Sequence, residues 1–174
     1  MLTEQELLDH GIDATRKANL LKLAAYLREL DHKKFDMGNF YEYYDEQQEE
    51  PVHLTPDKLE SYDEPSPCGT VACAVGCGPA AGLPSTEEDD DCWDTYSRRV
   101  FIKRDVSYKS HRVLAHRAWF FLFSGAWEPL DNTPTGAAER IEFLLENGLS
   151  FWDDSMNECD FFESLTKDNL PYKK

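Results

Sequence analysis

Three cysteines lie close together in a segment made almost entirely of small side chains. They are Cys68, Cys73 and Cys77, and Cys92 follows further along the chain. Thiolates bind zinc tetrahedrally, and Cys73 and Cys77 would share one face of a helix. Zinc knuckles, however, use paired ligands typically about two to four residues apart in turns. We therefore expect no cofactor, keep zinc as an alternative, and favour cysteines that pack as small apolar side chains against a close neighbour.

Cys68 also has the position of a candidate nucleophile. It precedes a predicted helix N-terminus, where the helix dipole and free amide groups lower the pKa of a thiol. His111 or His116 could then act as the base of a cysteine-dependent enzyme. Because these residue types occur in most chains and no spacing fixes their geometry, we keep the enzyme as an alternative and favour a protein without enzymatic activity.

A basic segment interrupts an otherwise acidic chain between Arg98 and Arg117. It could receive an anionic ligand such as a nucleotide, or its cations could pair with acids of the same chain. The candidate anion-binding residues are Arg98, Arg99, Lys103, Arg104 and Arg112.

Acidic residues dominate the composition. The chain has 34 acids and 18 bases, which gives a formal net charge of -16. Such a charge repels nucleic acid and favours either basic partners or simple solubility. Carboxylates interleaved with aromatic rings can also fill a basic groove on another protein. The candidate binding residues are Tyr41, Tyr43, Tyr44, Glu49, Glu50, Glu87, Glu88, Asp89, Asp90, Asp91 and Asp94.

Apolar residues at helical spacing predict three long helices that position these sites. They surround Leu20, Leu114 and Ile141 and should form the core. The third has the clearest limits, with Thr133 as its N-cap and Gly148 as its stop.

Shorter helices are expected elsewhere. The first begins with a capping box at Thr3, and a two-turn helix follows Thr70 in the small-residue segment. Another begins at Ser85 or Thr86 with an acidic run, Glu87 to Asp91, in its first turn, and a last one begins near Ser155.

These elements predict a mainly α protein. We expect one compact domain over residues 1–174, built as a helical bundle of five or six helices, with residues 41–67 as a long acidic loop or insertion. No run approaches the roughly 20 apolar residues of a membrane span, and the acidic N-terminus does not resemble a signal peptide. A cytoplasmic protein that does not contact a membrane is expected.

Four motifs carry a resemblance to a known family. Phe35-Asp36-Met37, the segment from Cys68 to Gly76, the segment from Tyr96 to Phe101 and the segment from Asp131 to Ile141 resemble, in this order, a family of small uncharacterised proteins carried by phages and bacterial genomes. The resemblance implies one small domain in a phage-like setting. It implies no activity.

The favoured hypothesis combines this setting with the charge. It is an acidic, non-enzymatic, phage-type binding protein in the cytoplasm of a bacterial host, which inhibits a basic host protein such as a defence nuclease by charge complementarity. Direct contact with nucleic acid is not expected. An anionic-nucleotide-binding protein and a cysteine-dependent enzyme are the alternatives.

Overall fold

The computed structural model describes residues 2–38, 41–45, 50–53, 71–89, 92–104, 114–153 and 155–173. This part of the chain is mainly helical, as predicted. Its α-helices are α1 (Glu4–Asp9), α2 (Ala14–Glu29), α4 (Trp93–Val100), α5 (Leu114–Phe123), α6 (Glu128–Asp131), α7 (Pro134–Asn147) and α8 (Glu158–Glu163). Three short 3-10 turns are η1 (His32–Lys34), η2 (Glu87–Asp89) and η3 (Gly125–Trp127). The strands are β1 (Tyr41–Asp45), β2 (Glu50–His53) and β3 (Val71–Ala72).

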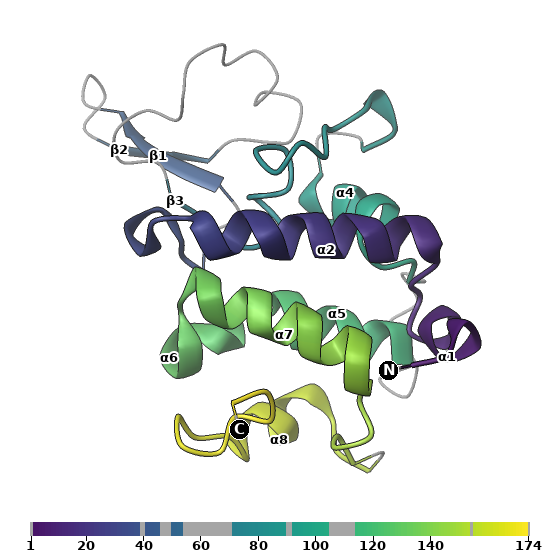
Figure 1. The fold of residues 1–174 in the computed structure, drawn as a ribbon. Helices are drawn as coiled ribbons and strands as arrows, with labels where there is room; N and C mark the ends of the chain where they lie inside the picture. Colours follow the sequence, from purple (N-terminus) through teal and green to yellow (C-terminus); the bar gives the residue numbers. More distant parts are fainter. Residues whose placement is uncertain are drawn as a thin grey trace.

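Helices α2 and α7 form the centre of the fold. They lie side by side and run in opposite directions (Figure 1). Each begins at a capping side chain: Asp13 accepts a hydrogen bond from the Arg16 amide at 2.8 Å, and Thr133, the predicted N-cap, accepts one from the Gly136 amide at 2.9 Å. Their buried faces contain Leu20, Leu23, Ala24, Leu27, Ala137, Ala138, Ile141, Leu144 and Leu145. Each buried leucine contributes about 1.5–3 kcal/mol to folding.

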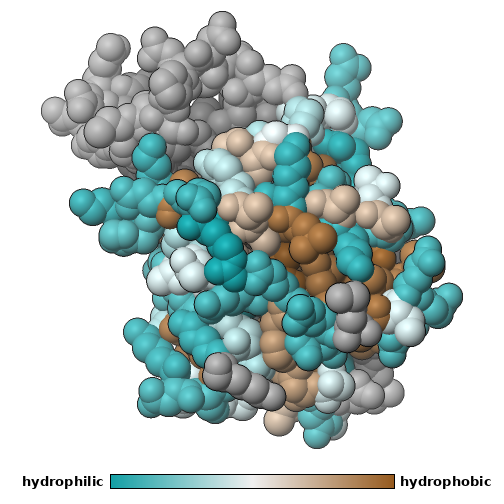
Figure 2. Space-filling view, in the orientation of Figure 1, coloured by the Kyte–Doolittle hydropathy of each residue, from teal (hydrophilic) through white to brown (hydrophobic). Residues whose placement is uncertain are grey.

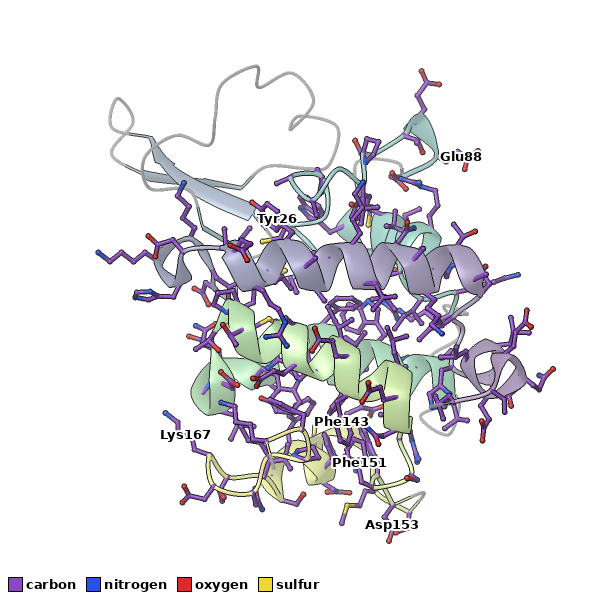
Figure 3. All side chains as sticks on the ribbon, in the orientation of Figure 1. Tyr26, Glu88, Phe143, Phe151, Asp153 and Lys167 are labelled. Atoms are coloured by element: carbon purple, nitrogen blue, oxygen red, sulfur yellow. The ribbon has the colours of Figure 1, made fainter. Side chains whose placement is uncertain are left out.

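The remaining helices surround this pair. Helices α4 and α5 lie behind it, and α8 with the C-terminal segment lies below α7 (Figure 1). Aromatic side chains fill the space between α7 and that segment. Figure 3 shows Phe143 and Phe151 beside each other there, with ring centroids 5.5 Å apart. The C-terminal segment is thus a part of the core, and Leu170 is buried in it.

A small sheet occupies the beginning of the predicted acidic loop. Its strand order is β2-β1-β3, with β1 antiparallel to both neighbours. Tyr43 pairs with Val52, and Tyr41 pairs with Ala72. Part of residues 41–67 is therefore a hairpin and not a loop, which agrees with the strand preference of its tyrosines. Residues 54–67 lie outside the described residues.

The small-residue segment folds as a series of turns and not as the predicted two-turn helix. The Cys77 amide donates to the Cys73 carbonyl at 3.0 Å, but the Gly78 amide bonds only three residues back and Pro79 has no N–H. The predicted close neighbour is present, because a β-carbon on Gly78 would come within 2.2 Å of the Tyr96 hydroxyl of α4.

Two helix starts differ from the prediction. The amide of Thr86 donates to the Asp89 carboxylate at 2.8 Å, which closes η2, so that α4 begins only after the acidic run. Helix α8 is capped by Asn157, whose side chain accepts from the Asp160 amide at 3.0 Å. Ser155 instead donates to Asp153. In both places an acidic side chain close to the expected cap forms the local hydrogen bond.

One face of the molecule carries an apolar area. Figure 2 shows it over α2, with hydrophilic residues around it, and Leu21 of α2 is 47% exposed. None of the helices in the described part of the chain is long and apolar enough to cross a membrane.

Candidate functional site

A cleft of about 850 Å³ opens between the end of α2 and the beginning of α7. The turn after α2 contributes Asp31 and His32, the first turns of α7 contribute Glu139, and the C-terminal segment contributes Tyr172 and Lys173. Ligand pockets typically have volumes of about 300–1,000 Å³, so this cleft has room for a side chain or a small ligand.

A buried carboxylate lies beside this cleft. Only 2% of the Asp131 side chain is exposed, and both of its oxygens accept hydrogen bonds. Oδ1 accepts from the Thr133 hydroxyl at 2.6 Å, and Oδ2 accepts from the Tyr172 hydroxyl at 2.9 Å. The Nζ of Lys173 lies 2.9 Å from Oδ2. Residues on both sides of α7 in the sequence therefore meet at one anion.

Gly136 makes room for this carboxylate. A β-carbon at this position would lie 2.0 Å from Oδ2 of Asp131, far inside van der Waals contact. The first turn of α7 can approach Asp131 only because residue 136 has no side chain. The Thr133 cap and Gly136 together hold the carboxylate against the start of the helix.

A buried cation, Arg140, is linked to the Asp131 carboxylate through Tyr172. Arg140 is fully buried, and its guanidinium carbon lies 4.5 Å from the ring centroid of Trp127. Its Nη1 donates to the Tyr172 hydroxyl at 3.3 Å, and this hydroxyl in turn donates to Asp131. Burial raises the pKa of Tyr172, so the phenol stays protonated and can act as this donor. Burial also lowers the pKa of Arg140, whereas Tyr172 and Asp131 oppose that shift.

Two carboxylates at or beside the cleft, those of Asp131 and Asp31, have lowered pKa values. Burial acts to raise the pKa of Asp131, but the hydrogen bonds from Thr133, Lys173 and Tyr172 outweigh it and the pKa is lowered. The pKa of Asp31 is also lowered, first by a hydrogen bond from the Lys33 amide. Asp31 lines the cleft and Asp131 contacts residues that line it, so the cleft is suited to bind a cation.

The acidic run predicted as a binding surface is partly neutralised within the protein. Asp89 is buried and forms two hydrogen bonds of 2.7 Å with Arg99. Asp94 forms ion pairs with Arg98 and Arg104. Glu87 and Glu88 are exposed, and Figure 3 shows Glu88 projecting away from the fold. Asp90 and Asp91 lie outside the described residues.

The same ion pairs involve arginines of the basic segment. Arg98, Arg99 and Arg104 pair with acids of this chain, and Arg104 also lies 4.2 Å from the ring centroid of Trp119. Lys103 is exposed, and Arg112 lies outside the described residues. Intramolecular pairing, one of the two interpretations of this segment, is thus present at all three arginines that the structure describes among the candidates.

The remaining aromatic and acidic candidates lie on the small sheet or outside the described residues. Tyr41, Tyr43 and Tyr44 are on β1 and Glu50 begins β2, whereas Glu49 lies outside the described residues. The three tyrosines and Glu50 therefore lie on two neighbouring strands, and Glu50 pairs in register with Asp45.

The cysteine and histidine candidates are not assembled into a described site. Cys73 and Cys77 are buried, and burial raises the pKa of Cys73 to about 11 and also raises that of Cys77. Cys92 is exposed. Within the described ranges no group of three or more histidine, cysteine or acidic side chains is arranged to hold a metal ion. Cys68 lies outside these ranges, so a zinc site that includes it stays a prediction.

His116 has a local partner. Its Nε2 lies 3.3 Å from Oε1 of Glu158, and its ring contacts Phe120 with centroids 4.8 Å apart. The candidate nucleophile Cys68 and the alternative base His111 lie outside the described residues. The enzyme alternative therefore stays a prediction that no described geometry supports.

Sequence reasoning missed the cleft. The sequence identifies Thr133 as a helix N-cap, and the segment from Asp131 to Ile141 carries the resemblance, but neither signal indicates a binding residue. The string Asp-x-Thr-Pro-x-Gly could have indicated a carboxylate held against a helix start. No local sequence pattern links this string to Tyr172 or Lys173.

Compared with models of protein families, with curated proteins and with solved structures, the chain matches none of them.

Proposed function

We propose that this chain is an acidic, non-enzymatic binding protein that engages a basic partner protein by charge complementarity, and that the cleft between α2 and α7 receives a cationic side chain of that partner. The ion pair between Asp131 and Lys173 carries the proposal, because a buried carboxylate beside an open cleft already binds a cation there. The net charge of -16 supports it, since it attracts basic proteins over a long range.

The cleft supports this function better than the acidic run does. Asp89 of the run and the nearby Asp94 are paired with arginines that are at most 30% exposed, whereas the cation paired with Asp131 is a lysine whose side chain is 47% exposed. At the cleft, Asp31 and Glu139 line the opening on opposite sides, from the turn after α2 and from α7. An entering cation would therefore meet carboxylates from two separate elements.

The biological setting rests on the resemblance alone. A phage-type protein in the cytoplasm of a bacterial host would meet basic host proteins, among them nucleases, and occupying a cationic surface of such a protein would inhibit it.

The experiment compares two double variants with equal loss of charge. Asp31→Asn/Glu139→Gln removes two carboxylates from the cleft, and Glu146→Gln/Glu163→Gln removes two exposed carboxylates elsewhere on α7 and α8. Each immobilised protein is used to recover partners from bacterial lysate at about 0.1 M and about 1 M salt, where the Debye length is about 10 Å and about 3 Å.

We expect the unchanged protein and the control variant to recover the same partner at low salt, the cleft variant to recover several-fold less, and high salt to abolish recovery. Equal recovery by the two double variants, or recovery that salt does not change, would contradict the proposal.

A further inference from the structure

We infer that the cleft recognises the primary ammonium group of a lysine side chain, and that Lys173 occupies this position while no partner is bound. The inference rests on the proposed function and adds to it the chemical group that is recognised. Its basis is the ion pair of 2.9 Å between Nζ of Lys173, which lines the cleft, and Oδ2 of Asp131, which contacts other residues that line it.

The acceptor is fixed before a ligand arrives. Asp131 is held by the Thr133 hydroxyl, by the Tyr172 hydroxyl and by the close approach of Gly136. Tyr172 is itself held by Arg140 and by the ring of Trp127, whose centroid lies 5.6 Å from its own. A carboxylate fixed in this way loses little freedom when a cation binds, which favours binding.

Lys173 is held much less firmly than its partner. Its side chain is 47% exposed, whereas that of Asp131 is 2% exposed. Ion pairs of exposed lysines shift an equilibrium by a factor of only about two to five, because water screens them and a long side chain loses rotamer freedom. A lysine of a partner protein can therefore displace Lys173 at small cost, and it gains contact with Asp31 and Glu139 at the mouth of the cleft.

The hydrogen bonds select an ammonium over a guanidinium. An arginine binds a carboxylate best when two parallel N–H groups reach both oxygens. Here Oδ1 already accepts from Thr133 and Oδ2 already accepts from Tyr172. The cation that is already present, Nζ of Lys173, approaches Oδ2 as a single charged group, and this geometry suits the compact charge of an ammonium group.

The test measures binding of fluorescein-labelled hexalysine and hexaarginine by anisotropy at low salt. Lys173→Ala removes the internal competitor. Lys167→Ala is its matched control, because it removes the same charge from an exposed side chain that Figure 3 shows pointing away from the fold. Asp131→Asn removes the negative charge and replaces one acceptor oxygen by an NH2 group, and circular dichroism of each variant checks folding.

Relative to the Lys167→Ala control, we expect Lys173→Ala to bind hexalysine about two- to fivefold more tightly. We expect Asp131→Asn to bind hexalysine at least about tenfold more weakly than the unchanged protein does. The loss of a hydrogen bond to a charged group lowers affinity by about this factor. The preference for hexalysine over hexaarginine should disappear in Asp131→Asn. If Asp131→Asn does not fold, the comparison of Lys173→Ala with Lys167→Ala still tests the inference.

Two failures can be told apart. Equal hexalysine affinity of Lys173→Ala and Lys167→Ala overturns the inference and leaves the proposed function standing. If hexalysine binding to the unchanged protein is the same as that to Asp31→Asn/Glu139→Gln, the cleft does not bind cations, and the proposed function fails with it.

Discussion

Asp89 and Arg99 lie ten positions apart in the sequence and are joined by two hydrogen bonds of 2.7 Å, one to each carboxylate oxygen. The Asp89 side chain is 1% exposed, whereas that of Arg99 is 30% exposed. The pair connects η2 to α4, so the carboxylate of Asp89, a candidate binding residue in the sequence, joins two elements of the fold.

Asp89→Asn should destabilise the protein by about 2 kcal/mol. Removing one partner of a buried pair costs about 3–5 kcal/mol, and water reaching Arg99 reduces this value. Urea unfolding measures the change. Glu88→Gln, at an exposed neighbouring carboxylate, should change the free energy of unfolding by no more than about 0.5 kcal/mol. Equal effects of the two substitutions would show that the Asp89 pair adds nothing to stability.

Gly136→Ala should destabilise the protein although alanine favours helices. The gain in helix propensity is about 1 kcal/mol, but overpacking costs about 1–3 kcal/mol and here a β-carbon would lie 2.0 Å from Asp131 Oδ2. A lower urea midpoint is expected. Gly125→Ala is the control, because its β-carbon would meet its nearest neighbour at 3.6 Å. An unchanged midpoint for Gly136→Ala would mean that Asp131 can move aside.

Stability should depend on the charge of Asp131 at acidic pH. Its pKa in the folded protein is lowered from the usual 3.8, so its contribution is complete above pH 3.8 and is lost as the pH falls through the folded pKa. The difference in free energy of unfolding between the unchanged protein and Asp131→Asn should therefore be largest near neutral pH and should narrow below 3.8. Urea unfolding at a series of pH values measures it. A constant difference would argue against an ionised Asp131.

The four described thiols should divide into two classes. At about pH 8, below the usual thiol pKa of about 8.5, Cys92 and Cys159 should react rapidly with a maleimide because they are exposed. Cys73 and Cys77 should react only after denaturation, because they are buried and burial raises the pKa of both. Peptide mass spectrometry assigns each thiol, and early labelling of Cys73 in the native protein would contradict the described packing.

The same labelling tests the enzyme alternative. A nucleophilic Cys68 beside a helix N-terminus should react selectively at mildly acidic pH, where ordinary thiols are protonated. Labelling of Cys68 that is no faster than that of Cys92 under these conditions would remove the argument for a catalytic thiol.

Much of the helical framework could be predicted because its signals are local. Thr133, Pro134 and Gly148 specify where α7 begins and ends, and Asp13 does the same for the start of α2. Caps and periodic apolar residues act within a few turns and need no knowledge of the rest of the fold. The turn series around Gly78 was not predictable in this way, since its conformation accommodates Tyr96 from another element.

The candidate site depends on contacts between distant residues. The hydrogen bond from Tyr172 to Asp131 spans 41 positions, and no pattern in the sequence pairs these two side chains. The acidic run was visible in the composition, but the turn that brings Asp89 to Arg99 was not. Composition therefore indicated how much charge the protein carries, and only the fold indicates which charges are available to a partner.

The position of Lys173 has a practical consequence for expressing this protein. Any sequence fused beyond this residue leaves the fold beside the cleft, so a histidine tag at that end would bring many imidazole groups to its mouth. The N-terminus lies near the other end of α7 (Figure 1). Purification handles and fluorescent labels therefore belong before Leu2, where they leave the cleft unobstructed.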